Sequence, residues 1–282
     1  MSNTRRSLPF AAALLLSLAF VPRTTDPAAH EVAASPTGAP NTTPRPADHP
    51  AATEVVVAAA ADLKYAMDSI VTVFSAKNPS ILVKPVYGSS GSFFEQINNG
   101  APFDLYFSAD IDYPKRLKEA GKTLSDVKRY ATGHLVLWSK TLDPAREQIN
   151  TLLNPAVGKI AIANPAHAPY GKRAEETLRY YKLYDKIKDK LVIGENISQT
   201  AQYAQTGAAD VGIIALSLAL SPTMKQAGGK YWLVPEAAHQ PLQQAYVLLA
   251  HAKDNSAAAQ FANFIGTPTV AAILKSFGFA QP

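Results

Sequence analysis

From residue 54 onward, short continuous apolar runs alternate with stretches whose apolar residues recur at helical spacing. The first run, Glu54 to Ala60, lacks polar-apolar alternation, which is typical of a parallel strand covered on both faces. The next stretch places Leu63, Ile70 and Phe74 on one face of a helix. The same alternation continues along the chain and predicts an α/β fold with mostly parallel, doubly wound sheets.

The predicted elements follow this alternation to the end of the chain. Strands are expected at residues 54–60, 81–87, 103–108, 133–138, 159–163, 191–193, 211–215, 231–234 and 245–250. Helices are expected after Asp62, after the loop at residues 88–91, and at 113–120, 144–153, 172–184, 198–205, 256–265 and 268–277.

The N-terminal stretch has a different composition. Arg5 and Arg6 precede an apolar segment, Leu8 to Phe20, which fits a signal peptide at residues 1–22 and falls short of the ~20 apolar residues of a membrane span. Residues 23–53 are rich in proline, alanine and threonine, with little to bury, and are predicted to be a disordered linker. We therefore expect the protein to be exported.

Composition excludes several classes of function. The 282 residues contain no cysteine, which rules out disulfides, thiol catalysis, thiolate metal sites and a lipid anchor on an N-terminal cysteine. The net charge of +5 is modest, and no run of lysine and arginine indicates a nucleic-acid-binding face.

The loop Gly88-Ser89-Ser90-Gly91 joins a predicted strand to a predicted helix. Ser92 and Glu95 are spaced as a capping box, which places the helix start at the end of the serine run. The hydroxyls of Ser89 and Ser90, together with the unpaired N–H groups of the first helical turn, suit a small anion. The alternative is an ordinary solvated turn.

Two further strand-to-helix junctions carry small or hydroxyl residues, Ala60-Ala61-Asp62 and Pro169-Tyr170-Gly171. In open α/β sheets, ligands bind outside the carboxyl ends of strands, where helix N-termini converge. Three such junctions facing one cleft would offer an anion many N–H donors without a cation.

The segment Gly100 to Asp110, GAPFDLYFSAD, resembles the hallmark segment of periplasmic molybdate-binding proteins, which load the molybdate ABC transporter. Val57 to Leu63, the serine loop, and Asn164 to Gly171 match that family in order and spacing, so the resemblance covers residues 54–280.

The resemblance implies a two-lobed periplasmic-binding-protein fold of the type II kind. Lobe 1 is expected to comprise residues 54–133 plus 240–282, and lobe 2 residues 134–239. It further implies a periplasmic, monomeric binding protein that captures molybdate or tungstate and delivers it to ABC transporter membrane subunits. No enzyme activity, no cofactor and no directly ligated metal are expected, because such an oxyanion is held by hydrogen bonds.

Site residues are carried over by position. Ser90 matches the serine ligand of the family, Tyr170 stands in a Pro-x-Gly turn that provides a backbone donor, and Ile197 stands at a further backbone donor position. Two positions depart from the family pattern: Asp62 replaces a common serine, and Ala215 replaces a common ligand tyrosine. We hypothesise that the Tyr170 phenol supplies the donor lost at Ala215.

Asp62 has two interpretations, because a carboxylate is repelled by a dianion. Either it caps the following helix, so that only its N–H faces the ligand, or it accepts a proton from a protonated oxyanion such as hydrogen phosphate. The common choice of aspartate before an apolar-periodic helix favours the cap.

Other functions fit parts of the sequence. A sulfate- or phosphate-binding protein remains an alternative, as does a ferric-ion-binding protein, since Tyr180, Tyr181 and Tyr184 cluster. Tyrosines at that spacing also fit helix packing. An enzyme is disfavoured because the serine loop lacks the spacing of a nucleophile elbow and the histidines lack metal-ligand spacing. An adhesive or structural exported domain would leave the matching loops unexplained.

Overall fold

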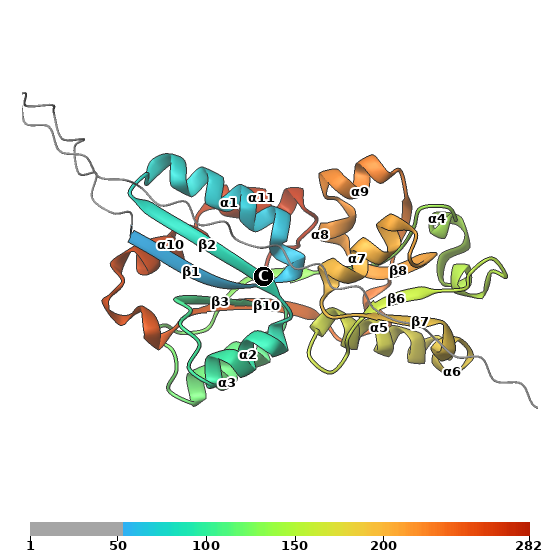
Figure 1. Ribbon diagram of the computed structural model, residues 1–282, viewed down its shortest axis with the longest axis horizontal. Helices are drawn as coiled ribbons and strands as arrows, with labels where there is room; N and C mark the ends of the chain where they lie inside the picture. The colour runs from blue at the N-terminus through green and yellow to red at the C-terminus, as the bar shows by residue number, and fades with distance from the viewer. Residues whose placement is uncertain (1–52) are drawn as a thin grey trace, which may run out of the picture. The chain divides into compact units, whose positions relative to one another are not determined.

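The structure, a computed structural model, describes residues 53–282 (Figure 1). The predicted signal peptide and all but the last residue of the predicted linker lie outside the described residues. Among residues 53–282, no single helix is long and apolar enough to cross a membrane, and the one pair of consecutive helices that reaches such a length is bent by 63°.

The first sheet has five strands, and all but one run in the same direction. In spatial order they are β2 (Ile81–Gly88), β1 (Thr53–Ala60), β3 (Leu105–Ser108), β10 (Leu242–Leu248) and β4 (Lys128–Gly133). β10 is antiparallel to both of its neighbours, whereas β1 is parallel to β2 and β3.

The second sheet repeats this arrangement. Its spatial order is β7 (Leu191–Gly194), β6 (Ile160–Ala163), β8 (Val211–Ala215), β5 (Leu135–Ser139) and β9 (Lys230–Leu233). β5 is antiparallel to β8 and β9, whereas β6 is parallel to both of its neighbours. The predicted α/β class, with two mixed and mostly parallel sheets, is therefore confirmed.

Helices cover both faces of each sheet (Figure 1). Around the first sheet they are α1 (Lys64–Lys77), α2 (Ser90–Asn98), α3 (Asp112–Glu119), α10 (Ser256–Ile265) and α11 (Pro268–Ser276). Around the second they are α4 (Pro144–Glu147), α5 (Pro169–Tyr180), α6 (Tyr184–Ile187), α7 (Ile197–Thr206), α8 (Leu216–Ala219) and α9 (Pro222–Ala227). Short 3₁₀ helices are η1 (Ala61–Leu63), η2 (Gln148–Leu153), η3 (Lys188–Lys190), η4 (Glu236–Ala238) and η5 (Ala250–Asp254). We call the first sheet with its helices lobe 1 and the second sheet with its helices lobe 2.

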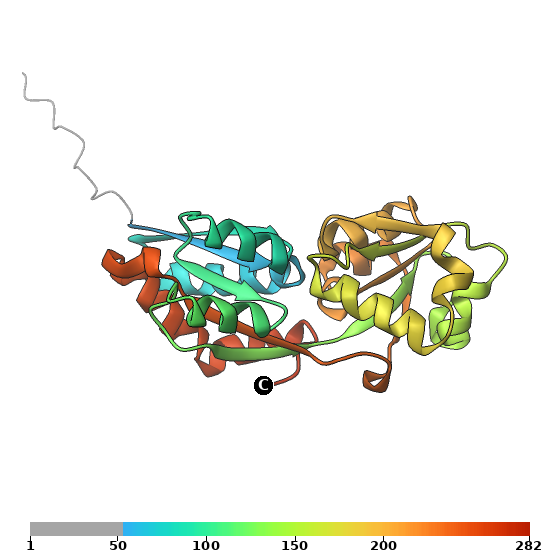
Figure 2. The same cartoon turned by 90° about the horizontal axis from the view of Figure 1, so that it is seen from below.

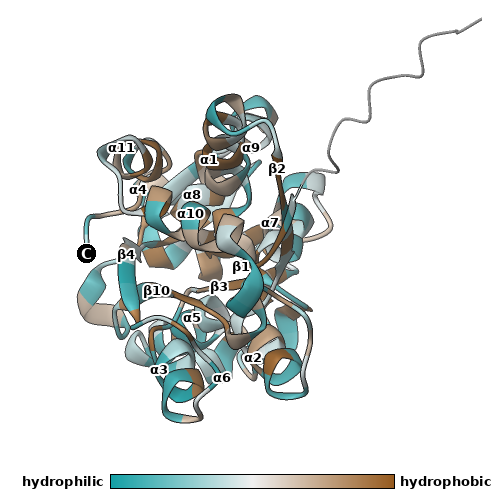
Figure 3. Cartoon of the chain, turned by 90° about the vertical axis from the view of Figure 1, so that its left-hand side faces the viewer, coloured by the Kyte–Doolittle hydropathy of each residue, from teal (hydrophilic) through white to brown (hydrophobic). Residues whose placement is uncertain are grey.

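The burial of β1 explains its uniformly apolar sequence. Val55 and Val57 pack in the core under α1, α10 and α11, while Val56 and Ala58, which alternate with them along the strand, pack on the α2 side. Since successive side chains of a strand point to opposite faces, a strand covered on both faces must be apolar at every position. In the hydropathy view, β3 and β10 are likewise hydrophobic and α3 on the outside is largely hydrophilic (Figure 3).

Two connections join the lobes. The chain leaves the first sheet after Gly133 and enters the second at Leu135, and it returns between Leu233 and Leu242. Leu242 pairs with Gly133, so the connections lie side by side (Figure 2).

Several predicted boundaries were wrong for local reasons. The helix expected at 144–153 changes to a 3₁₀ helix at Gln148, which has a positive φ of 53°. The helix expected at 172–184 begins earlier, at Pro169, and is interrupted near Lys182, whose φ is 56°. Strand β4 and helices α8 and α9 were not predicted.

Candidate functional site

The structure gathers all five predicted site residues around one small cavity between the two lobes. The cavity lies at the carboxyl ends of β1 and β2 and at the starts of three long helices. Its lining comprises Ala60, Ala61, Asp62, Gly88, Ser89, Ser90, Ala109, Ala168, Pro169, Tyr170 and Ile197. Its volume of about 10 Å³ corresponds to the space of about one water molecule. A site of this size excludes an organic ligand and suits one small inorganic group.

The serine loop begins α2, but the predicted cap was wrong by three residues. Ser89, not Ser92, is the N-cap, and its hydroxyl accepts the Ser92 N–H at 3.4 Å. Ser90 is the first helical residue, so its N–H has no acceptor inside the helix.

The Ser90 hydroxyl is placed to donate into the cavity. The side chain is 1% exposed, and its Oγ accepts the N–H of Ala109 at 3.0 Å. Accepting that bond leaves the hydroxyl proton free for a ligand, since a hydroxyl can donate and accept at once.

Helices α5 and α7 direct their N-termini at the same cavity from lobe 2. The first residue of α5 is Pro169, which has no backbone N–H, and the N-cap residue Ala168 has no side chain that could accept a hydrogen bond. The N–H of Tyr170 therefore has no acceptor within its own helix. In α7, the Asn196 side chain accepts the N–H groups of Ser198 and Gln199 at 3.0 and 3.1 Å. Ile197 therefore contributes a third unpaired first-turn N–H.

Asp62 does not cap the following helix, which corrects the favoured interpretation. It lies inside the 3₁₀ turn η1, and the residue at the N-cap position of α1 is Leu63. The Asp62 side chain points instead into the contact between the lobes and is only 1% exposed. Burial raises the pKa of its carboxyl to about 6, against the hydrogen bonds from Gln244 and Tyr170 that lower it.

A buried hydrogen-bond network holds this carboxyl. Asp62 Oδ2 accepts the Tyr170 hydroxyl at 3.0 Å and the Gln244 Nε2 at 2.6 Å. Gln244 Oε1 in turn accepts the Tyr130 hydroxyl at 2.5 Å. The Tyr170 phenol is thus bonded to Asp62, and this geometry gives no support to the hypothesis that it replaces the ligand tyrosine missing at Ala215.

Sequence reasoning missed Gln244 and Tyr130. Gln244 directly precedes the apolar run that begins at Ala245, and a polar amide at the start of a buried strand needs a partner. Gly133, at the end of β4, provides the space for this network: a Cβ there would lie 2.2 Å from the Tyr170 hydroxyl and 2.6 Å from Gln244 Nε2.

Direct bonds between the lobes surround the cavity. Gly91 N–H donates to the His167 carbonyl at 2.8 Å, and Ser89 Oγ lies 2.8 Å from His167 Nδ1. On the other side, the Ser198 hydroxyl donates to the Ala61 carbonyl at 2.8 Å, and the Ser217 hydroxyl to the Asp62 carbonyl at 2.7 Å. Both lobes thus contact the site and each other in this conformation.

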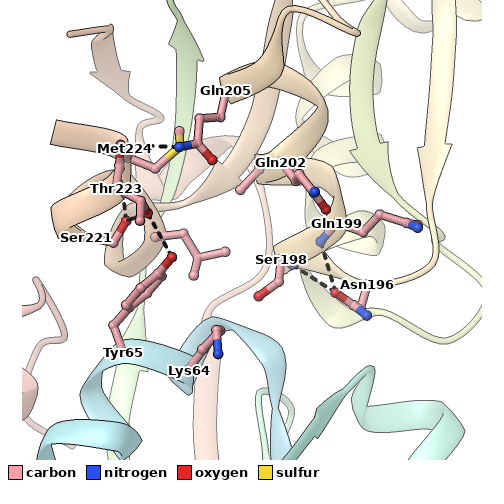
Figure 4. Close-up of a pocket in the computed structure, with 12 residues that line it drawn as sticks. Lys64, Tyr65, Asn196, Ser198, Gln199, Gln202, Gln205, Ser221, Thr223 and Met224 are labelled. Carbon is pink, nitrogen blue, oxygen red and sulfur yellow. Dashed lines mark hydrogen bonds between the residues drawn. The ribbon is translucent and has the colours of Figure 1, made fainter. Parts of the chain in front are cut away.

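A larger hollow of about 420 Å³ lies between the start of α1 and helices α7 and α9 (Figure 4). Its lining is mainly amide and hydroxyl side chains, including Gln199, Gln202 and Gln205 on one face of α7. The Tyr65 hydroxyl bonds to Thr223 Oγ1 at 2.8 Å across it. It contains none of the predicted site residues.

The rings of the tyrosine cluster pack against neighbouring side chains. The Tyr180 and Tyr181 rings pack edge to face with centroids 5.0 Å apart, and the Arg179 guanidinium stacks on Tyr184 at 4.1 Å. No group of three or more histidine, aspartate and glutamate side chains that could hold a metal ion occurs within residues 53–282. The ferric-ion alternative therefore has no support from this cluster.

Comparison with known proteins gives the family. Residues 55–280 match the family described as bacterial extracellular solute-binding protein. The chain belongs to this family. Within it, the chain is 37% identical over 232 residues to the molybdate-binding protein ModA of Rhodobacter capsulatus, covering 81% of this chain and 89% of that protein. It is 36% identical over 229 residues to ModA of Azotobacter vinelandii, covering 81% and 90% of the two chains.

A solved structure of this solute-binding family has the same fold. The periplasmic molybdate-binding protein of Azotobacter vinelandii superposes with a TM-score of 0.75 at 30% identity, covering 81% of this chain and 99% of that one. Membership identifies the chain as a solute-binding protein of a transport system.

Proposed function

We propose that this protein binds molybdate or tungstate in the cavity between its lobes and delivers it to the membrane subunits of an ABC transporter. The observation that carries the proposal is the convergence of unpaired N–H groups from Ser90, Tyr170 and Ile197, with the Ser90 hydroxyl, on one small cavity. The relatives at 36–37% identity bear the name molybdate-binding protein.

The donor set suits a fully ionised tetrahedral oxyanion. N–H groups at helix N-termini bind anions because their hydrogens are unpaired and the helix dipole is positive at that end. No lysine or arginine is among the cavity lining. Neutral donors recognise an oxyanion by the number and direction of its acceptors, which gives specificity among anions of equal charge.

Lobe movement completes the proposed mechanism. Four oxygens around a central atom need more room than the present cavity offers, so binding requires a small adjustment between the lobes. We assign residues 54–133 plus 240–282 to lobe 1 and 134–239 to lobe 2, with the two connections as hinges. A ligand that binds both lobes at once stabilises the closed arrangement, which the transporter recognises.

The cellular setting is part of the same proposal. The protein acts as a monomer in the periplasm, and residues 1–22 direct its export, with residues 23–53 as a linker. It needs no cofactor and carries out no reaction.

A panel of oxyanions tests the proposed function. Molybdate and tungstate should raise the melting temperature strongly, sulfate weakly and phosphate hardly at all, because a bound ligand stabilises the folded state by mass action. Isothermal titration calorimetry on the same panel should give the same order of affinity. Stabilisation by phosphate equal to that by molybdate would contradict the choice of ligand.

Hydrogen phosphate is the second candidate, and Asp62 is the observation in its favour. An ionised Asp62 could accept the proton of this ligand, whereas molybdate brings no proton of its own. The panel separates the two candidates directly.

A further inference from the structure

The two carboxyl oxygens of Asp62 have very different surroundings. Oδ2 accepts two hydrogen bonds, from Tyr170 and from Gln244. Oδ1 is buried and no group within residues 53–282 meets it at hydrogen-bond geometry, although the backbone N–H groups of Asp62 and Leu63 lie close enough to the carboxyl to lower its pKa. Because a buried polar atom without a partner is costly, an unpaired oxygen on a residue that lines a binding cavity indicates a bond completed by the ligand.

The network around Oδ2 fixes which oxygen can carry a proton. In this structure the Gln244 Oε1 accepts the Tyr130 hydroxyl, which directs the amide carbonyl away from Asp62. Its Nε2 therefore faces Oδ2, and the Tyr170 hydroxyl donates to the same atom. With two donors on Oδ2, a proton on this carboxyl belongs on Oδ1.

We propose that Asp62 is a specificity-determining residue that binds the oxyanion as a neutral acid, with its proton on Oδ1 donated to a ligand oxygen. This inference rests on the proposed oxyanion-binding function. It turns the apparent repulsion between a carboxylate and a dianion into a charge-assisted hydrogen bond.

A proton must then be taken up from solution when molybdate binds above the pKa of the free protein. The pKa of Asp62 in this structure is raised to about 6 by burial, and a bound dianion raises it further because like charges disfavour ionisation. Affinity should be independent of pH below about 6 and should fall by up to about tenfold per pH unit above it. Hydrogen phosphate supplies its own proton and would bind to ionised Asp62 without this uptake.

Other titratable groups near Asp62 do not substitute for it. Tyr170 on α5 and Tyr130 on β4 face the carboxyl, and burial raises the pKa of both well above the ordinary tyrosine value, so they remain neutral. Helices α7 and α8, which pack against η1, contain no acidic or basic residue. Lys64, at the start of α1, pairs with Asp68 at 3.8 Å near the surface.

The test is the number of protons bound with molybdate, measured by calorimetry in buffers of different ionisation enthalpy. At about pH 8, the wild-type protein should take up close to one proton per molybdate, and its affinity should be at least about tenfold weaker than at about pH 6. Asp62→Asn places an amide N–H donor where the protonated carboxyl would have its O–H. This variant should bind molybdate without proton uptake, and its affinity should not fall between about pH 6 and pH 8. Asp126→Asn, at a side chain 82% exposed on lobe 1, is the control and should behave as wild type.

The outcomes separate the inference from the function on which it rests. Molybdate binding by the wild-type protein without proton uptake, and with a pH dependence equal to that of Asp62→Asn, would overturn the role of Asp62 and leave the function standing. Failure of the wild-type protein to bind any oxyanion at either pH would overturn both. The wild-type proton count is decisive by itself should Asp62→Asn not fold.

Discussion

The Tyr170 hydroxyl donates a 3.0 Å hydrogen bond to Asp62 Oδ2, joining two residues 108 positions apart and on different lobes. This bond is buried, and it draws the start of α5 toward the end of β1. A hydrogen bond in such a low-dielectric environment stabilises the closed arrangement of the lobes. Because it joins the two lobes, its strength, and so the stability of that arrangement, depends on whether Asp62 is protonated.

Asp62 should make the stability of the ligand-free protein depend on pH. Its folded-state pKa of about 6 lies above the ordinary value of 3.8, so the folded protein binds this proton more tightly than the unfolded chain does. The stabilisation is complete below pH 3.8 and is lost as the pH rises through about 6, with a limit of about 3 kcal/mol. Urea unfolding from about pH 5 to pH 8 should show Asp62→Asn gaining stability relative to wild type as the pH rises.

Asp126→Asn is the control for that experiment, and its stability should run parallel to that of wild type from about pH 5 to pH 8. The Lys118 ammonium lowers the pKa of Asp126, so this carboxyl contributes stability that is lost as the pH falls. A wild-type curve that stays parallel to that of Asp62→Asn would show that Asp62 does not titrate in this range.

Ser90→Ala should weaken molybdate binding by about 1.5–3 kcal/mol, the range for a hydrogen bond to a charged group. It should also lower stability, because the buried Ala109 N–H loses its acceptor. Ser92→Ala is the matched control on the same helix, since Ser92 does not line the cavity and its hydroxyl accepts from Ser89. Titration calorimetry measures the molybdate affinity of both variants. Equal losses of affinity in Ser90→Ala and Ser92→Ala would place the ligand elsewhere in the loop.

Gly91→Ala should weaken ligand binding by holding the lobes apart. A Cβ at this position would lie 2.7 Å from the His167 carbonyl oxygen and 2.8 Å from its Cα, distances at which backbone has to shift. The substitution also disturbs the Gly91 N–H bond to that carbonyl. Small-angle scattering with and without molybdate should show a smaller change on ligand addition than in wild type.

The control for Gly91→Ala is the same substitution at another glycine of lobe 1, Gly266→Ala. Its Cβ would meet the Asn263 carbonyl oxygen at 3.6 Å, an ordinary contact, and the Gly266 φ of −76° suits any residue. The Gly266→Ala variant should bind molybdate and change its scattering on ligand addition as wild type does. If Gly91→Ala also shows the full wild-type scattering change, the close contact between Gly91 and the His167 backbone is not needed for binding.

Tyr170→Phe should shift the pH dependence of binding rather than remove binding. The phenol hydrogen bond stabilises the charged form of Asp62, so its loss raises the pKa of that carboxyl. Molybdate affinity should therefore persist to a higher pH than in wild type, while the Tyr170 N–H, a backbone group, still donates. Affinities measured by calorimetry across the pH range check this, and a uniform loss at every pH would instead indicate a direct bond from the phenol to the ligand.

Local patterns in the sequence were enough to predict the fold class and the positions of most strands and helices. Continuous apolar runs and helical spacing depend on neighbours a few residues away, and they located most strands and helices and the α/β class. The Gly-Ser-Ser-Gly loop and the Pro-Tyr-Gly turn marked strand-to-helix junctions for the same reason. The structure then placed Asp62, Ser89, Ser90, Tyr170 and Ile197 around one cavity.

Tertiary structure alone decided the detailed roles at the site. The capping-box pattern pointed to Ser92, whereas Ser89 takes the cap position, in a loop where Gly91 also contacts the His167 backbone 76 residues away. Asp62 looked like a cap because capping is local, yet its side chain bonds to Tyr170 and to Gln244, which is 182 residues away. A carboxylate in a dry interior is governed by whichever donors reach it, and which donors do so is fixed by how the two lobes pack.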